Sequence, residues 1–217
     1  MNNQTSGKPY VAKGSNVKRC GVCLLSLNFC ICSQRKKAHL TPDFPLEIWL
    51  LTHKEEQYKP TNTGRLIQHV LPQVTRTFIW HRTAPDPDFL LLLKDTRYQP
   101  YIIFPGDRGG YDDRVVEYAD QKSEKIPVFI ILDGSWRQAG RMFRLSQFLQ
   151  NLPVLPLKGQ LQSQYKLRKA PDDYHLCTAE VAVSLLASHQ QQTAADSLKA
   201  YFDVFNAEYA QSRRLKL

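Results

Sequence analysis

Residues 128–137 of this 217-residue chain read VFIILDGSWR. Five consecutive apolar residues end at Leu132, and the polar turn Asp133-Gly134-Ser135 follows at once. An apolar run of this length, bounded by turn residues, is typical of a strand that is buried on both faces. The next stretch carries arginines at helical spacing, so these ten residues predict a strand, a tight loop and the start of a helix.

The same alternation continues along the chain. Short apolar runs predict strands at residues 46–51, 77–80, 101–104, 128–132 and 154–157. Amphipathic stretches predict helices at about 63–71, 113–121, 136–150, 178–190 and 193–210. Alternating strands and helices indicate an α/β domain with a mostly parallel sheet flanked by helices. Ligands of such folds bind at the carboxyl ends of the strands.

The composition excludes several classes of protein. Hydrophobic residues make up 42% of the chain, which excludes global disorder, collagen and a coiled coil. No apolar run approaches the roughly 20 residues that cross a bilayer, because the longest, 89–93 and 128–132, are as short as strands. The N-terminus lacks the apolar core of a secretory signal, so we expect a cytoplasmic protein without a membrane partner.

Positive charge is concentrated in two blocks. The net charge is +9; residues 1–42 and 134–171 each hold seven basic side chains and no acidic one. Lysine and arginine displace counterions from phosphates, so two acid-free blocks favour binding to nucleic acid. The alternative is a solvated surface that only aids solubility.

Four of the five cysteines lie close together, as Cys20-x2-Cys23-x6-Cys30-x-Cys32. Four thiolates at this spacing could hold one metal ion tetrahedrally, and we predict a structural Zn²⁺. Two disulfides or an iron–sulfur cluster are the alternatives. The chain is therefore divided into a disordered basic tail at 1–17, a cysteine-bearing appendage at 18–40 and an α/β domain at 41–217.

The loop after Leu132 is the first candidate for chemistry. Asp133 could take a proton and Trp136 could supply a stacking or desolvating wall, beside Arg137, Arg141 and Arg144 on one helix face. The alternative is that Asp133 or Ser135 only caps the helix and that Trp136 fills the core.

Three further segments could bind ligands. The polar residues 61–65 open a helix whose N–H groups could accept an anion, and the glycines in 104–110 permit close approach of a ligand. Arg168 could grip a carboxylate or a phosphate. The first two segments have structural alternatives: capping for 61–65 and a simple turn for 104–110. Thr178 and Glu180 are explained without a function as the N-cap and first turn of a helix. The histidines, including His53, form no recognisable metal motif, and we interpret them as structural or surface residues.

Together these segments resemble the DTW-domain proteins, a family of tRNA-uridine aminocarboxypropyltransferases. The likeness is carried, in the family's order, by the four cysteines, Thr61-Asn62-Thr63-Gly64-Arg65-Leu66, Phe104-Pro105-Gly106, Asp133-Gly134-Ser135-Trp136, Arg168-Lys169-Ala170-Pro171 and Thr178-Ala179-Glu180. Ser135 replaces the threonine of the family's name-giving motif and keeps a hydroxyl.

The resemblance implies transfer of the 3-amino-3-carboxypropyl group of S-adenosylmethionine to N3 of a uridine in tRNA, in the variable loop, with release of methylthioadenosine. It also implies kinship with the SPOUT class, whose cofactor sits in a knotted C-terminal part. We expect tRNA as the partner, with no obligate protein partner.

The resemblance also assigns roles to individual residues. The catalytic set is Asp133 as general base, Trp136 and Ser135. The S-adenosylmethionine set is Phe104, Pro105, Gly106, Leu132, Gly134, Leu155, Arg168, Thr178 and Glu180. The RNA set is Thr61, Asn62, Thr63, Gly64, Arg65, Arg137, Arg141, Arg144, Lys166 and Lys169. The metal set is Cys20, Cys23, Cys30 and Cys32.

Two other functions fit the same features. An RNA methyltransferase dependent on S-adenosylmethionine could use the same fold, and it would release S-adenosylhomocysteine. A zinc-containing RNA-binding module without catalysis would explain the charge and the cysteines, but not Asp133 and Trp136 at a strand end.

Overall fold

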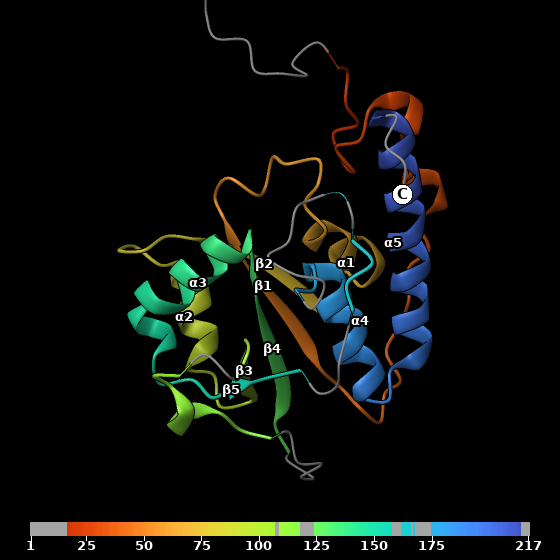
Figure 1. Cartoon of the computed structure of the whole chain (residues 1–217). Helices are drawn as coiled ribbons and strands as arrows, with labels where there is room; N and C mark the ends of the chain where they lie inside the picture. The colour runs from red at the N-terminus through yellow and green to blue at the C-terminus, as the bar shows by residue number, and fades with distance from the viewer. Residues whose placement is uncertain are drawn as a thin grey trace, which may run out of the picture.

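A central sheet of five parallel strands organises the chain (Figure 1). The computed structural model describes residues 17–106, 109–117, 124–157, 162–165, 167 and 175–213. The strands are β1 (Glu47–His53), β2 (Thr75–Trp80), β3 (Tyr98–Ile103), β4 (Ile126–Asp133) and β5 (Val154–Leu155). They lie in the order β2-β1-β4-β3-β5, and each neighbouring pair is parallel. The predicted α/β fold with a parallel sheet flanked by helices is confirmed.

Alternate residues of β4 enter two separate hydrophobic cores, because successive side chains of a strand point to opposite faces of the sheet. Phe129 and Ile131 pack in the core with α1 (Gly64–Val70), α4 (Thr178–Ser188) and α5 (Gln192–Arg213). Ile130 and Leu132 pack on the other face with α2 (Pro87–Leu93) and α3 (Trp136–Leu145). Figure 1 shows the two helix layers on either side of the sheet. The apolar run 128–132 is therefore a strand that is buried on both faces, as the sequence predicted.

Several elements differ from the prediction. The apolar run 89–93, for which no element was predicted, is part of helix α2: the Asp86 carboxylate accepts hydrogen bonds from the N–H groups of Asp88 and Phe89, and Pro87 occupies the first turn. This is a strong helix start. In the expected helix 113–121, the described residues form only a short 3₁₀ turn, Asp112–Arg114, and residues 118–123 lie outside the described part.

Other boundaries shift by a few residues. Helix α3 ends at Leu145, and a separate 3₁₀ turn, Gln147–Leu149, completes the stretch that was predicted as one helix. β3 begins at Tyr98, three residues before the predicted start, and β5 ends at Leu155, two residues before the predicted end.

The cysteine-bearing segment packs against the main core. Cys23, Leu25 and Ile31 are buried in the same cluster as α1, α4 and α5. The N–H of Ala38 donates to the carbonyl of Val70, the last residue of α1, at 2.8 Å. Figure 1 shows this red segment wrapping one end of α5. Of the predicted disordered tail at 1–17, residues 1–16 lie outside the described part.

None of the helices in the described ranges combines the length and the apolar character that a membrane crossing needs.

Candidate active site

The Asp133 carboxylate lies at the carboxyl end of β4, where the strand pairs with β1 in the register Thr52↔Asp133. The residue is only 2% exposed. Three donors hold its carboxylate: the Thr52 hydroxyl at 3.1 Å and the Asn62 amide at 2.8 Å bind Oδ2, and the Thr178 hydroxyl at 2.8 Å binds Oδ1. The donors come from β1, from the loop before α1 and from α4, so one carboxylate joins three segments that are far apart in sequence.

The loop before α1 approaches Asp133 closely. The first residue of α1 is Gly64, and a Cβ atom there would lie 2.8 Å from Cγ and Oδ2 of Asp133 and 2.9 Å from Oδ1. Only a residue without a side chain fits this position. Next to it, the Thr63 hydroxyl accepts a hydrogen bond from the N–H of Ala179 at 3.2 Å, which ties the loop to α4.

Helix α4 begins differently from the prediction. Thr178 was expected to be the N-cap, but the N-cap is Cys177 and Thr178 is the first helical residue, which leaves its hydroxyl free to donate to Asp133. Glu180 lies in the first turn, as predicted, and its carboxylate accepts from the N–H of Cys177 at 2.8 Å. The same carboxylate binds the Ser163 hydroxyl and the N–H of Gln164. Glu180 therefore orders the residues that lead into α4.

Burial raises the pKa of Asp133 above its ordinary value, and the hydrogen bonds from Asn62, Thr178 and Thr52 oppose this effect. The nearby Glu56 raises the pKa further. Glu56 is fully buried, and one of its carboxylate oxygens pairs with Lys59 at 2.6 Å. A carboxyl group with a raised pKa is suited to accept a proton near neutral pH.

In the loop after Asp133, Ser135 is the N-cap of α3. Its hydroxyl accepts from the N–H of Gln138, and the Gln138 side chain accepts from the N–H of Ser135, which completes a capping box. Trp136 is half-buried, and its ring packs edge-on against His175 with the centroids 4.4 Å apart. Of the structural alternatives for this loop, the Ser135 cap is confirmed, whereas Asp133 does not cap the helix.

The end of β1 adds residues that sequence reasoning missed. Thr52 holds Asp133, and His53 stacks on Trp80 of β2 with the ring centroids 5.6 Å apart. Nδ1 of His53 lies 3.1 Å from Nε2 of Gln138 in α3. The signal in the sequence that could have identified Thr52 and His53 was their position directly after the predicted strand 46–51.

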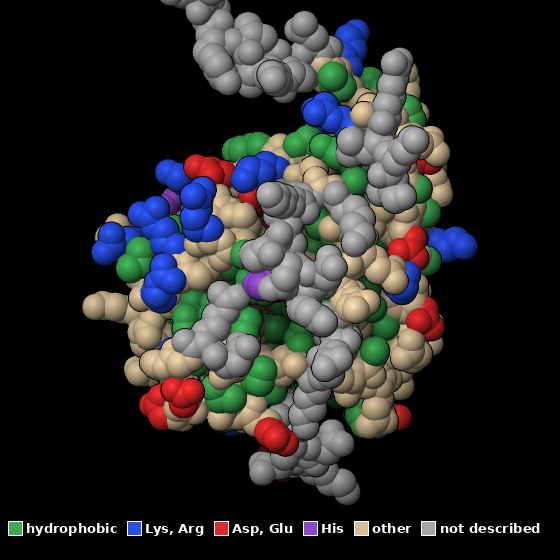
Figure 2. Space-filling model, in the orientation of Figure 1, with side chains coloured by type: hydrophobic (Ala, Val, Ile, Leu, Met, Phe, Trp, Pro, Cys, Tyr) green, Lys and Arg blue, Asp and Glu red, His purple; other side chains and the backbone are tan. Residues whose placement is uncertain are grey.

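The arginines of α3 form an exposed surface. Arg137, Arg141 and Arg144 are all exposed, as their spacing on one helix face predicted. Figure 2 shows Lys and Arg side chains gathered at the left of the view, over the place of α3 in Figure 1. Because α3 begins three residues after Asp133, this basic surface starts beside the buried carboxylate.

Other predicted site residues have structural contacts. Phe104 stacks on Phe143 with the centroids 4.2 Å apart, and the carbonyl of Pro105 accepts a hydrogen bond from the Tyr111 hydroxyl. Leu132 and Leu155 are buried in the two cores.

The glycines and the 61–65 loop complete the set. Cβ atoms at Gly106 and Gly134 would lie 3.3 Å from Pro156 and 3.1 Å from Gln138. The carbonyl of Thr61 accepts from the Tyr165 hydroxyl at 2.6 Å, and the Arg65 guanidinium donates to the carbonyls of Lys59, Asn62 and Gln57. The predicted Arg168, Lys166 and Lys169 lie outside the described residues.

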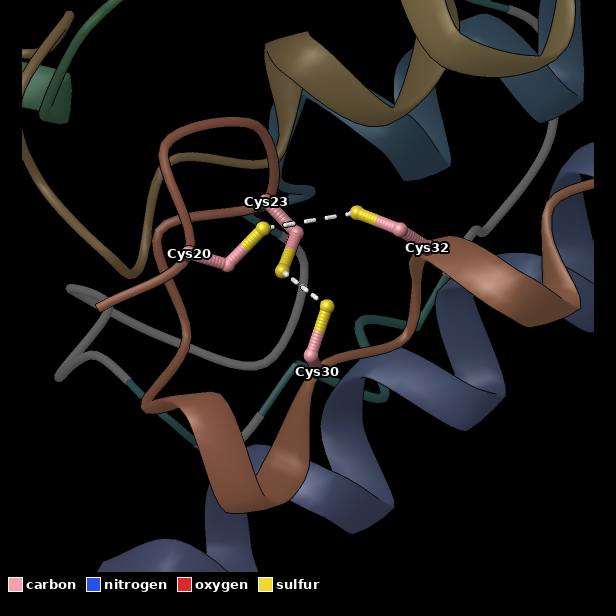
Figure 3. Close-up of side chains that lie close together, drawn as sticks. All are labelled: Cys20, Cys23, Cys30 and Cys32. Carbon is pink, nitrogen blue, oxygen red and sulfur yellow. Dashed lines mark hydrogen bonds between the residues drawn. The ribbon is translucent and has the colours of Figure 1, made fainter. Parts of the chain in front are cut away.

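The four cysteines converge as predicted (Figure 3). Their sulfur atoms all lie within 4.8 Å of one another; Sγ of Cys20 is 3.6 Å from that of Cys32, and Sγ of Cys23 is 3.8 Å from that of Cys30. Tetrahedral zinc with Zn–S bonds of about 2.3 Å needs sulfur atoms about 3.8 Å apart. Backbone N–H groups of Cys23 and Val22 lower the pKa of Cys20 to about 6, whereas burial raises the pKa values of Cys23 and Cys32. The cluster could hold a metal ion.

Comparison with known proteins gives a family and named relatives. The DTW domain family matches residues 17–210. The chain is 26% identical over 182 residues to a tRNA-uridine aminocarboxypropyltransferase 2 from Macaca fascicularis. This alignment covers 78% of this chain and 60% of that protein. It is 26% identical over 191 residues to the Mus musculus protein of the same name, covering 83% and 61%. The chain thus spans about three fifths of the length of these relatives. No solved structure matches it.

Proposed function

The chain belongs to the DTW domain family, and on that premise we propose that it transfers the 3-amino-3-carboxypropyl group of S-adenosylmethionine to N3 of a uridine in tRNA. The names of its relatives support the transferred group and the tRNA uridine. S-adenosylmethionine as the donor, N3 as the acceptor and the variable loop as the target rest on the family resemblance.

The buried carboxylate at the end of β4 is the observation that carries this proposal. Three polar donors from separate segments converge on Asp133, and the pKa of that carboxyl is raised by burial. A structural cap needs neither feature. A group that must accept the N3 proton of uridine near neutral pH needs a raised pKa.

The proposed reaction moves one proton and one carbon group. The N3–H bond breaks, the N3 electron pair attacks the methylene group attached to sulfur, and the carbon–sulfur electron pair stays on sulfur in methylthioadenosine. Asp133 is 2% exposed, whereas Thr178 is half-buried and its hydroxyl binds Oδ1. We therefore propose that the Thr178 hydroxyl accepts the N3 proton while it passes its own proton to Asp133.

The remaining residues would bind the two substrates. Exposed Arg137, Arg141 and Arg144 would bind RNA phosphates, together with Lys166 and Lys169, while the 104–106 and 132–136 loops would contact S-adenosylmethionine. Arg168 would hold the carboxylate of the donor. A knotted, SPOUT-like C-terminal part rests on the family resemblance.

The N-terminal part would serve as a metal-binding appendage. We propose a structural Zn²⁺ at the four cysteines of the 18–40 segment, attached to a catalytic domain at 41–217, with the basic residues 1–17 as a tail. The sulfur separations of 3.6 and 3.8 Å support zinc over two disulfides, because bonded sulfur atoms are only about 2.05 Å apart.

One assay tests the function. Purified protein, unmodified tRNA and labelled S-adenosylmethionine are incubated, and the nucleosides and the small product are identified by mass spectrometry. Aminocarboxypropyl-uridine with methylthioadenosine is the expected result. S-adenosylhomocysteine with a methylated nucleoside would show a methyltransferase instead, and tRNA binding with no product would show a non-catalytic module.

A further inference from the structure

His53 lies at the same edge of the sheet as Asp133. It is the last residue of β1 and directly follows Thr52, which donates to the Asp133 carboxylate. The residue is 8% exposed, and its ring stacks on Trp80 and contacts Gln138 of α3. His53 therefore flanks the loop after Asp133 from the side of the sheet that α3 covers.

The side-chain amide of Gln138 has a fixed orientation. Its Oε1 accepts from the N–H of Ser135 at 2.8 Å and lies 2.9 Å from the Ser135 hydroxyl. Its Nε2 donates to the Glu55 carboxylate at 2.9 Å. A flipped amide would place an oxygen against that carboxylate and an NH₂ group against the N–H of Ser135, so both contacts select the same orientation.

This orientation determines which nitrogen of His53 carries the proton. Nδ1 faces two donors, Nε2 of Gln138 at 3.1 Å and the N–H of Glu55 at 3.4 Å. A nitrogen between two donors must be an acceptor, so the proton of neutral His53 is on Nε2. An imidazolium would place an Nδ1–H against both donors.

The neutral form is also favoured by burial. Burial lowers the pKa of His53; the carboxylates of Glu55 and Glu56 oppose this, and the ammonium groups of Lys59 and Lys54 add to it. Across the part of the chain that the structure describes, no hydrogen bond involves Nε2 of His53. His53 therefore offers one N–H donor without a partner among the described residues, at the edge of the sheet where β1 and β4 end.

We infer that His53 is a further catalytic residue of the proposed reaction, which donates a hydrogen bond from Nε2 to a carbonyl oxygen of the uracil ring. The inference rests on the proposed function and adds a contact to the base. It revises the interpretation of His53 as a structural or surface residue.

The chemistry of uracil explains why such a donor would help. N3 lies between two carbonyl groups, and the negative charge that forms when N3 loses its proton spreads onto both oxygens. A fixed neutral N–H donor stabilises that charge without competing for the proton. Loss of one comparable donor in other enzymes lowers kcat by about 10²–10³-fold.

The tautomer can be measured without any activity. Long-range ¹H–¹⁵N spectra of the full chain, with His53 assigned through a His53→Phe variant, should show a neutral ring with the proton on Nε2 at pH 7. In Gln138→Glu the capping box keeps its acceptor, but an oxygen replaces the donor at Nδ1, so the proton should move onto Nδ1. A wild-type ring that is protonated on Nδ1, alone or in addition to Nε2, would overturn the inference.

Kinetics test the contact with the base. His53→Phe keeps a ring on Trp80 but has no donor, and we expect kcat to fall by about 10²-fold with an unchanged thermal midpoint and tRNA affinity. His53→Gln, which keeps an N–H donor, should recover part of this loss. His81→Phe is the matched control, because His81 is exposed one residue beyond β2. If folded His53→Phe stays within about threefold of wild type, His53 does not act on the substrate.

Sulfur substitution identifies the oxygen and excludes a purely structural role. With RNA that carries 2-thiouridine or 4-thiouridine at the target, the wild type should lose about tenfold for one of the two, because sulfur is a poor acceptor. His53→Phe should show no further loss for that substrate, since coupled changes are not additive. Full additivity for both substrates would refute the contact. An inactive wild type would refute the proposed function and with it the uracil contact, while the tautomer is decided by the spectra alone.

Discussion

Replacement of Gly64 by alanine tests whether the Asp133 cluster is as tightly assembled as the geometry indicates. At most helical positions, Gly→Ala stabilises a protein by about 0.4–1 kcal/mol. At Gly64 the new Cβ would lie 2.8 Å from Cγ and Oδ2 of Asp133. An ordinary carbon contact is about 3.5 Å, so the two groups must separate by about 0.7 Å.

That separation would break hydrogen bonds. The bonds from Asn62 and Thr178 to Asp133 are 2.8 Å long, and a shift of this size takes them to the limit of hydrogen bonding. Each is worth about 1–3 kcal/mol, because a buried acceptor would be left unsatisfied. Set against the gain from alanine, Gly64→Ala should lower the free energy of unfolding by about 2 kcal/mol. In a chain of this size the thermal midpoint should fall by about 4–8 °C.

The chain contains its own control for this experiment. A Cβ on Gly140, in the middle of α3, would have as its nearest neighbour a terminal nitrogen of the flexible Arg144 side chain at 3.7 Å. Gly140→Ala should therefore stabilise the protein by about 0.5–1 kcal/mol. Urea unfolding of both variants, followed by circular dichroism, gives the two signs. If Gly64→Ala is as stable as the wild type or more stable, the close approach of Gly64 to Asp133 does not exist in solution.

Three further outcomes follow from the same structure. Asp133→Asn should reduce transfer by at least about 10²-fold. Because the pKa of Asp133 is raised in the folded state, the wild type should lose stability relative to this variant as the pH rises above the ordinary value of 3.8 and through the raised pKa. An equal pH dependence of unfolding in the two proteins would contradict that shift. Chelation or Cys23→Ser should lower the thermal midpoint and release one equivalent of metal, measurable by elemental analysis, since metal binding supplies folding free energy; a midpoint that is insensitive to chelator would remove the structural role. Single replacement of the exposed α3 arginines, Arg137, Arg141 and Arg144, should weaken tRNA binding. Each should reduce the slope of log affinity against log salt concentration by about 1 for each phosphate that is no longer neutralised. Slopes equal to that of the wild type would exclude this surface as the RNA-binding surface.

The sheet could be predicted from the sequence because its central strands, β1 and β4, are buried on both faces. Residues 128–132 and 48–51 are apolar runs followed by polar residues, a pattern that depends on local composition alone. Helix α2 was missed because its five-residue apolar run shows no helical periodicity. Asp86, which caps two N–H groups, and Pro87 identify it as a helix. Local capping chemistry decided that element, and composition did not.

The site was predictable as a set of loops but not as a set of contacts. Asn62, Asp133 and Thr178 were each found because they follow a predicted strand or open a predicted helix. That they meet at one carboxylate depends on the pairing of β1 with β4, which a single sequence does not encode locally. Thr52 and His53 were missed for the same reason, since their roles come from the register Thr52↔Asp133 and from a glutamine 85 positions away.

The short helix α1 connects the two predicted centres of the molecule. It begins at Gly64, against the Asp133 carboxylate, and ends at Val70, whose carbonyl binds Ala38 at the end of the cysteine-bearing segment. A helix of seven residues is too short to be stable alone, so both of its ends must be held by tertiary contacts. The cysteine cluster is buried against the core that holds α1, through Cys23 and Ile31. A metal ion at the cysteines would thus stabilise the helix that positions the 61–64 loop, and its removal should weaken catalysis even though the cluster lies outside the active site.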